Sequence, residues 1–340
     1  MRGQPHAAAQ SFGGLGLALL VGWAAGCQKR PGRELPVEPE SAVMSPQGPS
    51  PLDALSGANA TPGTCADGQA FYDRLFARDD VEATIAFGYL DEHLPTIRGY
   101  IRHTLLKLDP VPVFLNSQED LLAETRTRFV DSGYVEVSRS PTGLVLVREF
   151  RYRGRPKTLR VHVVFSIARC PGERVDEHGR LWRYDNQTCP EQQRATTRAK
   201  ARFAGSFATS GIAVYHGHAR LGWGLDFGPL SLDEGKLSLD CESLHCGRPE
   251  AAQTLVFVNG CDTVGHYADS FARLRRTLPP GHELAWLGTR GDVLTMNAPE
   301  ISLRLLNEII AARCPKDVLA VMNLPRRHPE DHSRVEREGF

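Results

Sequence analysis

Apolar residues in the second half of the chain form short continuous runs that alternate with amphipathic segments. The runs are GIAVY (211–215), TLVFV (254–258) and ELAWLG (283–288). Continuous apolar runs of this length are typical of strands buried on both faces of a sheet. Helical periodicity predicts helices at about 191–207, 266–277 and 299–312. Strands alternating with helices predict an α/β fold, a three-layer sandwich in which helices flank a mostly parallel sheet.

The first half of the body has a less regular pattern. Its predicted elements are a helical region (68–108), a short strand (111–116), a helix through Phe129 and a strand (134–137). Two longer β segments, 143–154 and 158–168, are joined by a Gly- and Pro-containing turn, which predicts a β-hairpin insertion. One more strand is predicted at 316–324. The polar residues 326–340 are predicted to form a disordered tail.

The N-terminus carries a short apolar segment, Phe12–Ala25, after Arg2. Its 14 residues are too few to span a bilayer, which takes about 20, so it is typical of an export signal. Small residues lead directly into Cys27, and this stretch resembles a bacterial lipobox, whose cysteine receives the lipid. Gln28 follows, which favours the outer membrane. We therefore expect a signal peptide at 1–27 and a lipid anchor in the bacterial cell envelope, the alternative being an ordinary signal peptide with an incidental cysteine.

Residues 28–64 contain seven prolines together with Gly, Ser and Glu. Such a segment cannot bury enough apolar surface to offset its ordering entropy, so we predict a disordered tether that leads to a folded body at 65–325. Lys plus Arg equals Asp plus Glu at 40 each, which gives a formal net charge of zero. This balance, without a long basic block, argues against nucleic acid as a partner.

An exported protein can form disulfides. Lipidation of Cys27 leaves seven cysteines, so full pairing leaves one thiol over. The predicted pairs are Cys170–Cys189 and Cys241–Cys246, each closing a loop, and Cys65–Cys314, which would tie the start of the body to its end. On this pairing the remaining thiol is Cys261, although six cysteines alone allow many connectivities.

Two of the apolar runs end on small residues and each delivers a reactive side chain. HGH (216–218) follows the first run, and NGC (259–261) follows the second. Functional groups gather beyond the carboxyl ends of parallel strands, so we expect both sets at one edge of the sheet. An imidazole can take the proton of a thiol near neutral pH, and the thiolate is a nucleophile. Backbone N–H groups around Gly260 and Cys261, and that of Gly217, are candidates to hold an oxyanion.

These residues carry a resemblance to a known group of enzymes. YHGHA (215–219) resembles the Tyr-x-Gly-His-Gly stretch of gingipain-like peptidases, and VFVNGCDTVG (256–265) resembles the segment around their nucleophile. ELAWLGTRGDV (283–293) resembles their next strand and loop. Over roughly 200–315 the chain thus resembles the caspase, legumain and gingipain group of cysteine peptidases. The resemblance implies a caspase-like fold, hydrolysis of a polypeptide substrate with Cys261 as nucleophile and His218 as base, and no cofactor.

Several alternatives remain open at this point. His216 competes with His218, because a strand followed by His-Gly matches the plain caspase pattern. Ala219 replaces the usual glycine, which leaves open a catalytically inactive caspase-fold lipoprotein that acts as a binding module. Asp226 and Arg290 are candidates for substrate contacts, with a turn cap and a surface salt bridge as the respective alternatives. A zinc site is the last reading. Its ligands would come from His216, His218, Cys241, His245, Cys246 and Cys261.

Overall fold

The computed structural model describes the folded body of the chain. The described residues are 66–90, 111–113, 115–174, 176, 181–183, 189–209, 211–219, 222, 224–229, 235–246, 253–327 and 331–338. The predicted signal segment with Cys27, the predicted tether and Cys65 lie outside them.

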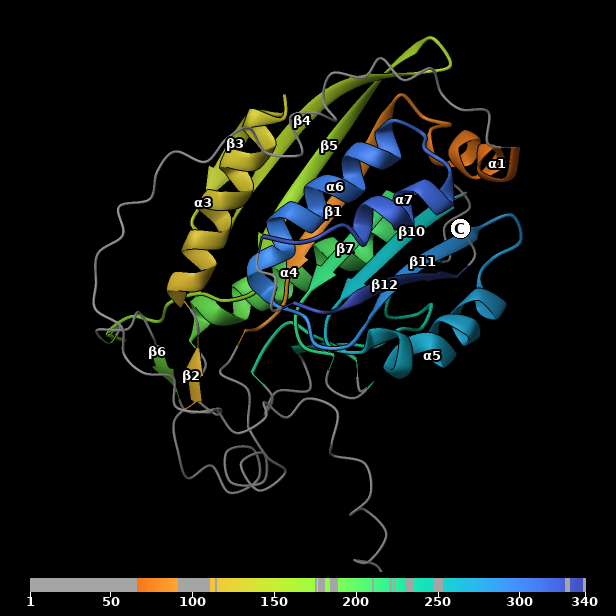
Figure 1. The fold of residues 1–340 in the computed structure, drawn as a ribbon. Coiled ribbons are helices and arrows are strands. Elements are labelled where there is room, and N and C mark those ends of the chain that lie inside the picture. The colour runs from red at the N-terminus through yellow and green to blue at the C-terminus, as the bar shows by residue number, and fades with distance from the viewer. Residues whose placement is uncertain are drawn as a thin grey trace, which may run out of the picture.

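Eight strands of the described chain form a central sheet in the order β12-β11-β10-β7-β1-β5-β4-β3 (Figure 1). The five inner strands are parallel, namely β11 (Glu283–Arg290), β10 (Gln253–Asn259), β7 (Gly211–His216), β1 (Asp80–Phe87) and β5 (Arg155–Phe165). The antiparallel strands are β12 (Arg334–Glu338) on one side, and β4 (Gly143–Tyr152) and β3 (Val135–Ser140) on the other. Two small ribbons pair β2 (Val111–Val113) with β6 (Leu181–Arg183), and β8 (Leu225–Asp226) with β9 (Lys236–Leu237).

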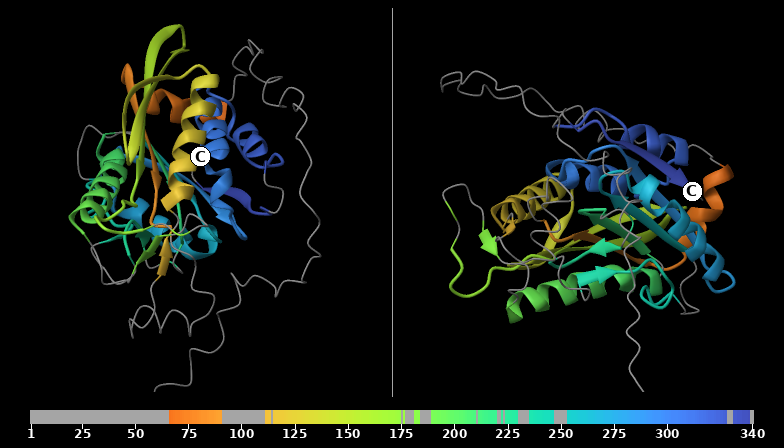
Figure 2. Two further views of the ribbon diagram at one scale, coloured as in Figure 1. Left: turned by 90° about the vertical axis from the view of Figure 1, so that its left-hand side faces the viewer. Right: turned by 90° about the horizontal axis from the view of Figure 1, so that it is seen from below.

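Helices cover both faces of this sheet, so the body has three layers (Figure 2). One face packs against α1 (Ala66–Leu75), α3 (Leu115–Asp131), α6 (Ala298–Ile310) and α7 (Pro315–Met322). The other face packs against α4 (Pro190–Ala208) and α5 (Thr263–Thr277). The predicted α/β class, with a mostly parallel sheet flanked by helices, is confirmed. The predicted hairpin forms as β4–β5, but it is part of the central sheet and not an insertion.

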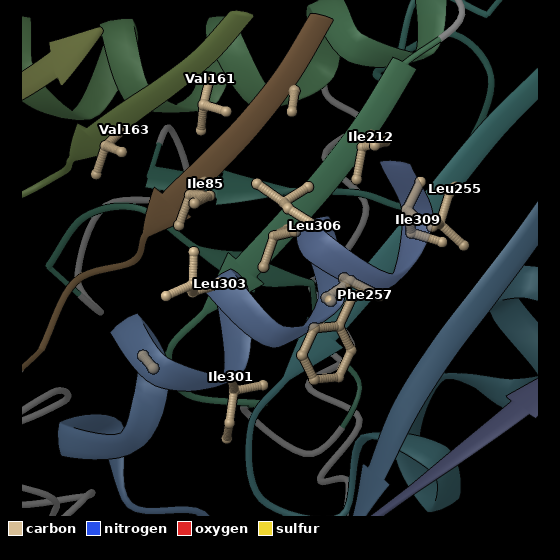
Figure 3. Close-up of a cluster of buried hydrophobic side chains, with 14 of the residues drawn as sticks. Ile85, Val161, Val163, Ile212, Leu255, Phe257, Ile301, Leu303, Leu306 and Ile309 are labelled. Atoms are coloured by element: carbon tan, nitrogen blue, oxygen red, sulfur yellow. The ribbon is translucent and has the colours of Figure 1, made fainter. Parts of the chain in front are cut away.

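The larger core lies between α6 and the inner strands. The strand side chains drawn in Figure 3 are Ile85, Val161, Val163, Ile212, Leu255 and Phe257, and those from α6 are Ile301, Leu303, Leu306 and Ile309. Most α6 side chains are buried, because α3 and α7 pack against it as well as the sheet. This burial fixes α6 across the middle strands, with its first turns toward their carboxyl ends (Figure 1).

Two predicted disulfides are present. Cys170 pairs with Cys189 and Cys241 with Cys246, with Cα atoms 5.7 Å and 5.1 Å apart. Cys261 and Cys314 lie outside both bridges. The predicted Cys65–Cys314 bridge involves a residue outside the described part of the chain. It therefore stays a prediction, although α1 packs near this position: a Cβ atom added to Gly68 would lie 3.1 Å from the Cδ atom of Pro315.

Three elements differ from their predictions. The region predicted as helix from 68 holds α1 only to Leu75, and the central strand β1 follows; residues 91–110 lie outside the described chain. The segment predicted as a strand at 316–324 is α7, because Pro315 starts a helix well and Val318 and Met322 are buried one turn apart. The prediction of a disordered tail at 326–340 is wrong for Arg334–Glu338, because these residues form β12, which pairs with β11.

Among the described residues, no helix combines the length and apolar character needed to cross a membrane.

Candidate functional site

The candidate residues follow two neighbouring parallel strands. β7 and β10 are paired so that His216 and Asn259, their last residues, are Cα partners. Gly217 continues this ladder, because its N–H donates to the Asn259 carbonyl oxygen at 3.2 Å. His218 and Cys261 then follow at the same edge of the sheet, and both are half-buried. The carboxyl edge of a parallel sheet is where ligands most often bind.

The two loops are in direct contact. A Cβ atom added to Gly260 would lie 2.5 Å from the carbonyl oxygen of Gly217 and 3.5 Å from the amide nitrogen of Ala219. Glycine is therefore required at this position for the loops to approach each other. Gly217 and Ala219 flank His218, and Gly260 precedes Cys261, so the sequence-predicted pair shares one small region.

The turn that carries Cys261 is held by β11. The Asp262 N–H donates to the Gly291 carbonyl oxygen at 3.0 Å, and Asp262 adopts a left-handed conformation with φ of 43° before α5 begins. The Thr289 hydroxyl donates to the Gly260 carbonyl oxygen. Cys261 thus sits on a fixed turn at the N-terminus of a helix, where the backbone dipoles favour negative charge.

Both glycine N–H donors assigned from the sequence are already engaged. The Gly260 N–H donates to Thr289 Oγ1 at 3.3 Å, and the Gly217 N–H donates to the Asn259 carbonyl oxygen. In this geometry both glycines close the loops rather than present N–H groups to a ligand. This bonding does not support the expectation that the two N–H groups hold an oxyanion, because Gly217 extends the β7–β10 ladder by one residue and Thr289 of β11 accepts the Gly260 N–H.

His216 lies inside the core. It is fully buried, and its ring packs near Phe87 and Phe257, with centroid distances of 5.2 Å and 6.2 Å. The side-chain amide of Asn259 donates to Nδ1 at 2.8 Å, so the ring proton is on Nε2, which donates to Ser302 Oγ at 2.6 Å. Burial lowers the pKa of His216 to about 3, so the ring stays neutral. These contacts make His216 a bridge between β10 and α6, and they favour His218 as the accessible histidine.

The two weak substrate-contact candidates behave as their alternatives described. Asp226 is buried, and its carboxylate accepts the Gly228 N–H at 3.4 Å, as in a turn cap. Arg290 is exposed and pairs with both carboxylate oxygens of Glu336 at 3.1 Å, with Asp262 Oδ1 at 3.8 Å. Arg290 therefore lies beside the Cys261 turn in a surface ion pair.

The zinc reading is contradicted by the bonding of its cysteines. Cys241 and Cys246 form a disulfide with each other and so supply no thiolates. Within the described part of the chain, no group of three or more His, Cys, Asp or Glu side chains is arranged to hold a metal ion.

Several residues that shape the site were assigned no role from the sequence. They are Asn259, Thr263, Thr289 and Ser302, whose polar groups hold the strand ends and the Cys261 turn. The signal was available for two of them: Asn259 and Thr289 are polar residues that end otherwise apolar runs. No protein-family model, curated protein or solved structure matches this chain, so the site stands on its geometry alone.

Proposed function

We propose that this protein is a cysteine endopeptidase of the caspase-like type, with Cys261 as the nucleophile and His218 as the general base and acid. The observation that carries the proposal is the contact of Gly260 with the residues that flank His218, at the ends of two adjacent parallel strands. The order of the elements agrees with the resemblance in the sequence: a strand ends at the histidine, and the neighbouring strand ends at the cysteine.

The proposed reaction needs only these two side chains and water. His218 takes the thiol proton of Cys261, and the sulfur attacks the carbonyl carbon of the scissile peptide bond. The C–N bond breaks as the imidazolium gives its proton to the leaving amine, which leaves a thioester. Water, deprotonated by His218, then attacks the thioester carbon; the C–S bond breaks and the thiol is restored. No cofactor enters these steps, and the partner is a polypeptide substrate.

The proposal includes a place in the cell. A lipid on Cys27 would hold the body at the bacterial envelope, with the outer membrane favoured, through the tether at 28–64. This part rests on the sequence pattern alone, because those residues lie outside the described chain.

One observation favours a second candidate, a caspase-fold lipoprotein that binds without cleaving. The N–H groups of Gly217 and Gly260 are engaged within the protein, which leaves the stabilisation of an oxyanion to other donors. An inactive protein would keep the fold and the loop contact but lack enhanced thiol reactivity.

Thiol reactivity separates the two candidates. The purified full chain would be treated with a peptidyl electrophile and with iodoacetamide near neutral pH, and the modified residue mapped by mass spectrometry. We expect labelling at Cys261, slowed by ~10²–10⁴-fold in His218→Ala, which is the range of general acid–base assistance. His332→Ala, which removes an exposed histidine of the C-terminal segment, is the matched control. Equal labelling rates in His218→Ala and the control would leave the binding module as the better description.

A further inference from the structure

Tyr267 joins the two elements that carry the proposed dyad. It lies in the second turn of α5, the helix that starts directly after the Cys261 turn, and it is fully buried. Its hydroxyl is 2.6 Å from the carbonyl oxygen of Ala219 and 2.8 Å from that of Gly224. A tyrosine hydroxyl has one proton, so the two carbonyls share it. The loop that follows His218 is thereby tied to the helix that follows Cys261.

Tyr215 holds the same loop from the other side. Its buried hydroxyl accepts the Asp226 N–H at 3.0 Å, and its one proton is shared between the carbonyl oxygens of Asp226 at 3.0 Å and His218 at 3.3 Å. Gly88 and Gly217 make room for this hydroxyl, since a Cβ atom at either position would overlap it. Tyr215 belongs to β7, the strand that leads directly into the histidine loop, so it fixes the loop to the strand that precedes it. Of the two tyrosines, Tyr267 is the one that belongs to α5, the helix that follows Cys261.

We infer that Tyr267 is a positioning residue that sets His218 against Cys261 through its bond to the Ala219 carbonyl. This inference rests on the proposed function. A general base acts only within hydrogen-bond reach of the proton it takes, and a displacement of about 1 Å can cost ~10²-fold in rate. The Ala219 peptide is adjacent to His218, so release of its carbonyl lets the histidine move relative to α5. Loss of the hydroxyl acts on the spacing of the dyad, not on either reacting group.

Tyr72 offers a matched control. Its hydroxyl donates to the Arg313 carbonyl oxygen at 2.6 Å, and the residue is buried. It lies on α1, whose Arg74 contacts Gln253 at the beginning of β10, so it is at the edge of the sheet opposite to Cys261. Tyr72→Phe and Tyr267→Phe remove the same kind of buried bond, and only one of them borders the site.

The test measures the rate of iodoacetamide alkylation at Cys261 against pH, using the full chain and peptide mapping. The variants are Tyr267→Phe, Tyr72→Phe, His218→Ala and the Tyr267→Phe/His218→Ala double variant. We expect Tyr267→Phe to slow alkylation near neutral pH by roughly 10- to 100-fold, and Tyr72→Phe to leave it unchanged. In the His218→Ala background, Tyr267→Phe should have no further effect, because the group that it positions is absent.

The outcomes distinguish the inference from the function on which it rests. If His218→Ala does not slow alkylation, the dyad fails and the positioning role fails with it. If His218→Ala slows alkylation but Tyr267→Phe matches Tyr72→Phe, the dyad stands and the positioning role is refuted. Equal slowing by Tyr267→Phe in both backgrounds would also refute it, because that pattern shows a general effect on the fold. Melting temperatures of the two Tyr→Phe variants show whether their losses of stability are comparable.

Discussion

The buried histidine of β7 should make the protein sensitive to acid. His216 is enclosed by Phe87, Phe257, Asn259 and Ser302, and burial alone lowers its pKa to about 3. In the unfolded chain a histidine titrates near pH 6.5. Below that pH the unfolded state binds a proton that the folded state does not bind. The free energy of unfolding therefore falls as the pH falls. Above it both states are neutral, and His216 adds no pH dependence.

The size of the effect follows from the two pKa values. With an unfolded value of about 6.5 and a folded value of about 3, linkage gives a loss of about 3 kcal/mol between about pH 7.5 and about pH 4.5. His216→Gln removes the titration and keeps the pairing, because its amide oxygen can accept from Asn259 and its NH₂ can donate to Ser302. Over this range the free energy of unfolding of the variant should therefore fall by about 3 kcal/mol less than that of the wild type. His282, whose pKa burial also lowers, is present in both proteins, so its contribution cancels.

The measurement is the free energy of unfolding from urea denaturation at several pH values, with the disulfides kept oxidised. The decisive quantity is the change in the free energy of unfolding with pH in each protein. Absolute values are not compared, because His216→Gln also alters packing at every pH. Parallel pH dependences for the two proteins would show that His216 titrates normally, and they would refute the claim that His216 is a buried, neutral group.

Two further predictions concern the cysteines that lie toward the ends of the chain. Cys65 should be bonded to Cys314, because α1 starts at Ala66 and packs against the residue after Cys314; proteolytic mapping without reduction should recover the linked peptides, and alkylation of Cys314 before reduction would contradict this. Cys27 should carry lipid, so a fatty-acid analogue should label the protein in cells, and label retained after Cys27→Ala would exclude this anchor.

The parallel part of the fold could be predicted because its strands are buried on both faces. The runs that became β7, β10 and β11 are apolar almost without interruption, and only central strands of a covered sheet need that pattern. The same runs located the candidate site, since their ends had to meet at one edge. Short separation in the sequence was likewise enough to predict two disulfides. Cys170 and Cys189 flank a polar loop, and Cys241 and Cys246 close a tight one.

A strand could not be predicted where its polar side chains bind partners that are far away in the sequence. β1 carries Glu82 and Thr84 in the middle of the sheet, and α4 supplies their partners: Arg202 donates to Glu82 at 2.9 Å, and Ser206 to Thr84 at 2.9 Å. Those partners are more than a hundred residues away in the sequence. β12 could not be predicted because it is an edge strand with a single buried apolar residue. Its other side chains are charged, so the segment has the composition of a polar tail.

The different properties of the two histidines follow from where the strands end. His216 is the last residue of β7, with Phe87 of β1 and Asn259 of β10 as its partners on either side, so the full width of the sheet and α6 enclose it. His218 lies two residues later, one residue beyond the Gly217 bond that ends the ladder, and it is half-buried rather than enclosed. A general base must hold a proton during the reaction, and at about pH 7 a histidine with a pKa of about 3 would need about 5 kcal/mol to do so. This free-energy cost alone would slow the reaction by several thousandfold. The register of three strands, which the sequence does not reveal, thus buries His216 and leaves His218 as the candidate base of the proposed dyad.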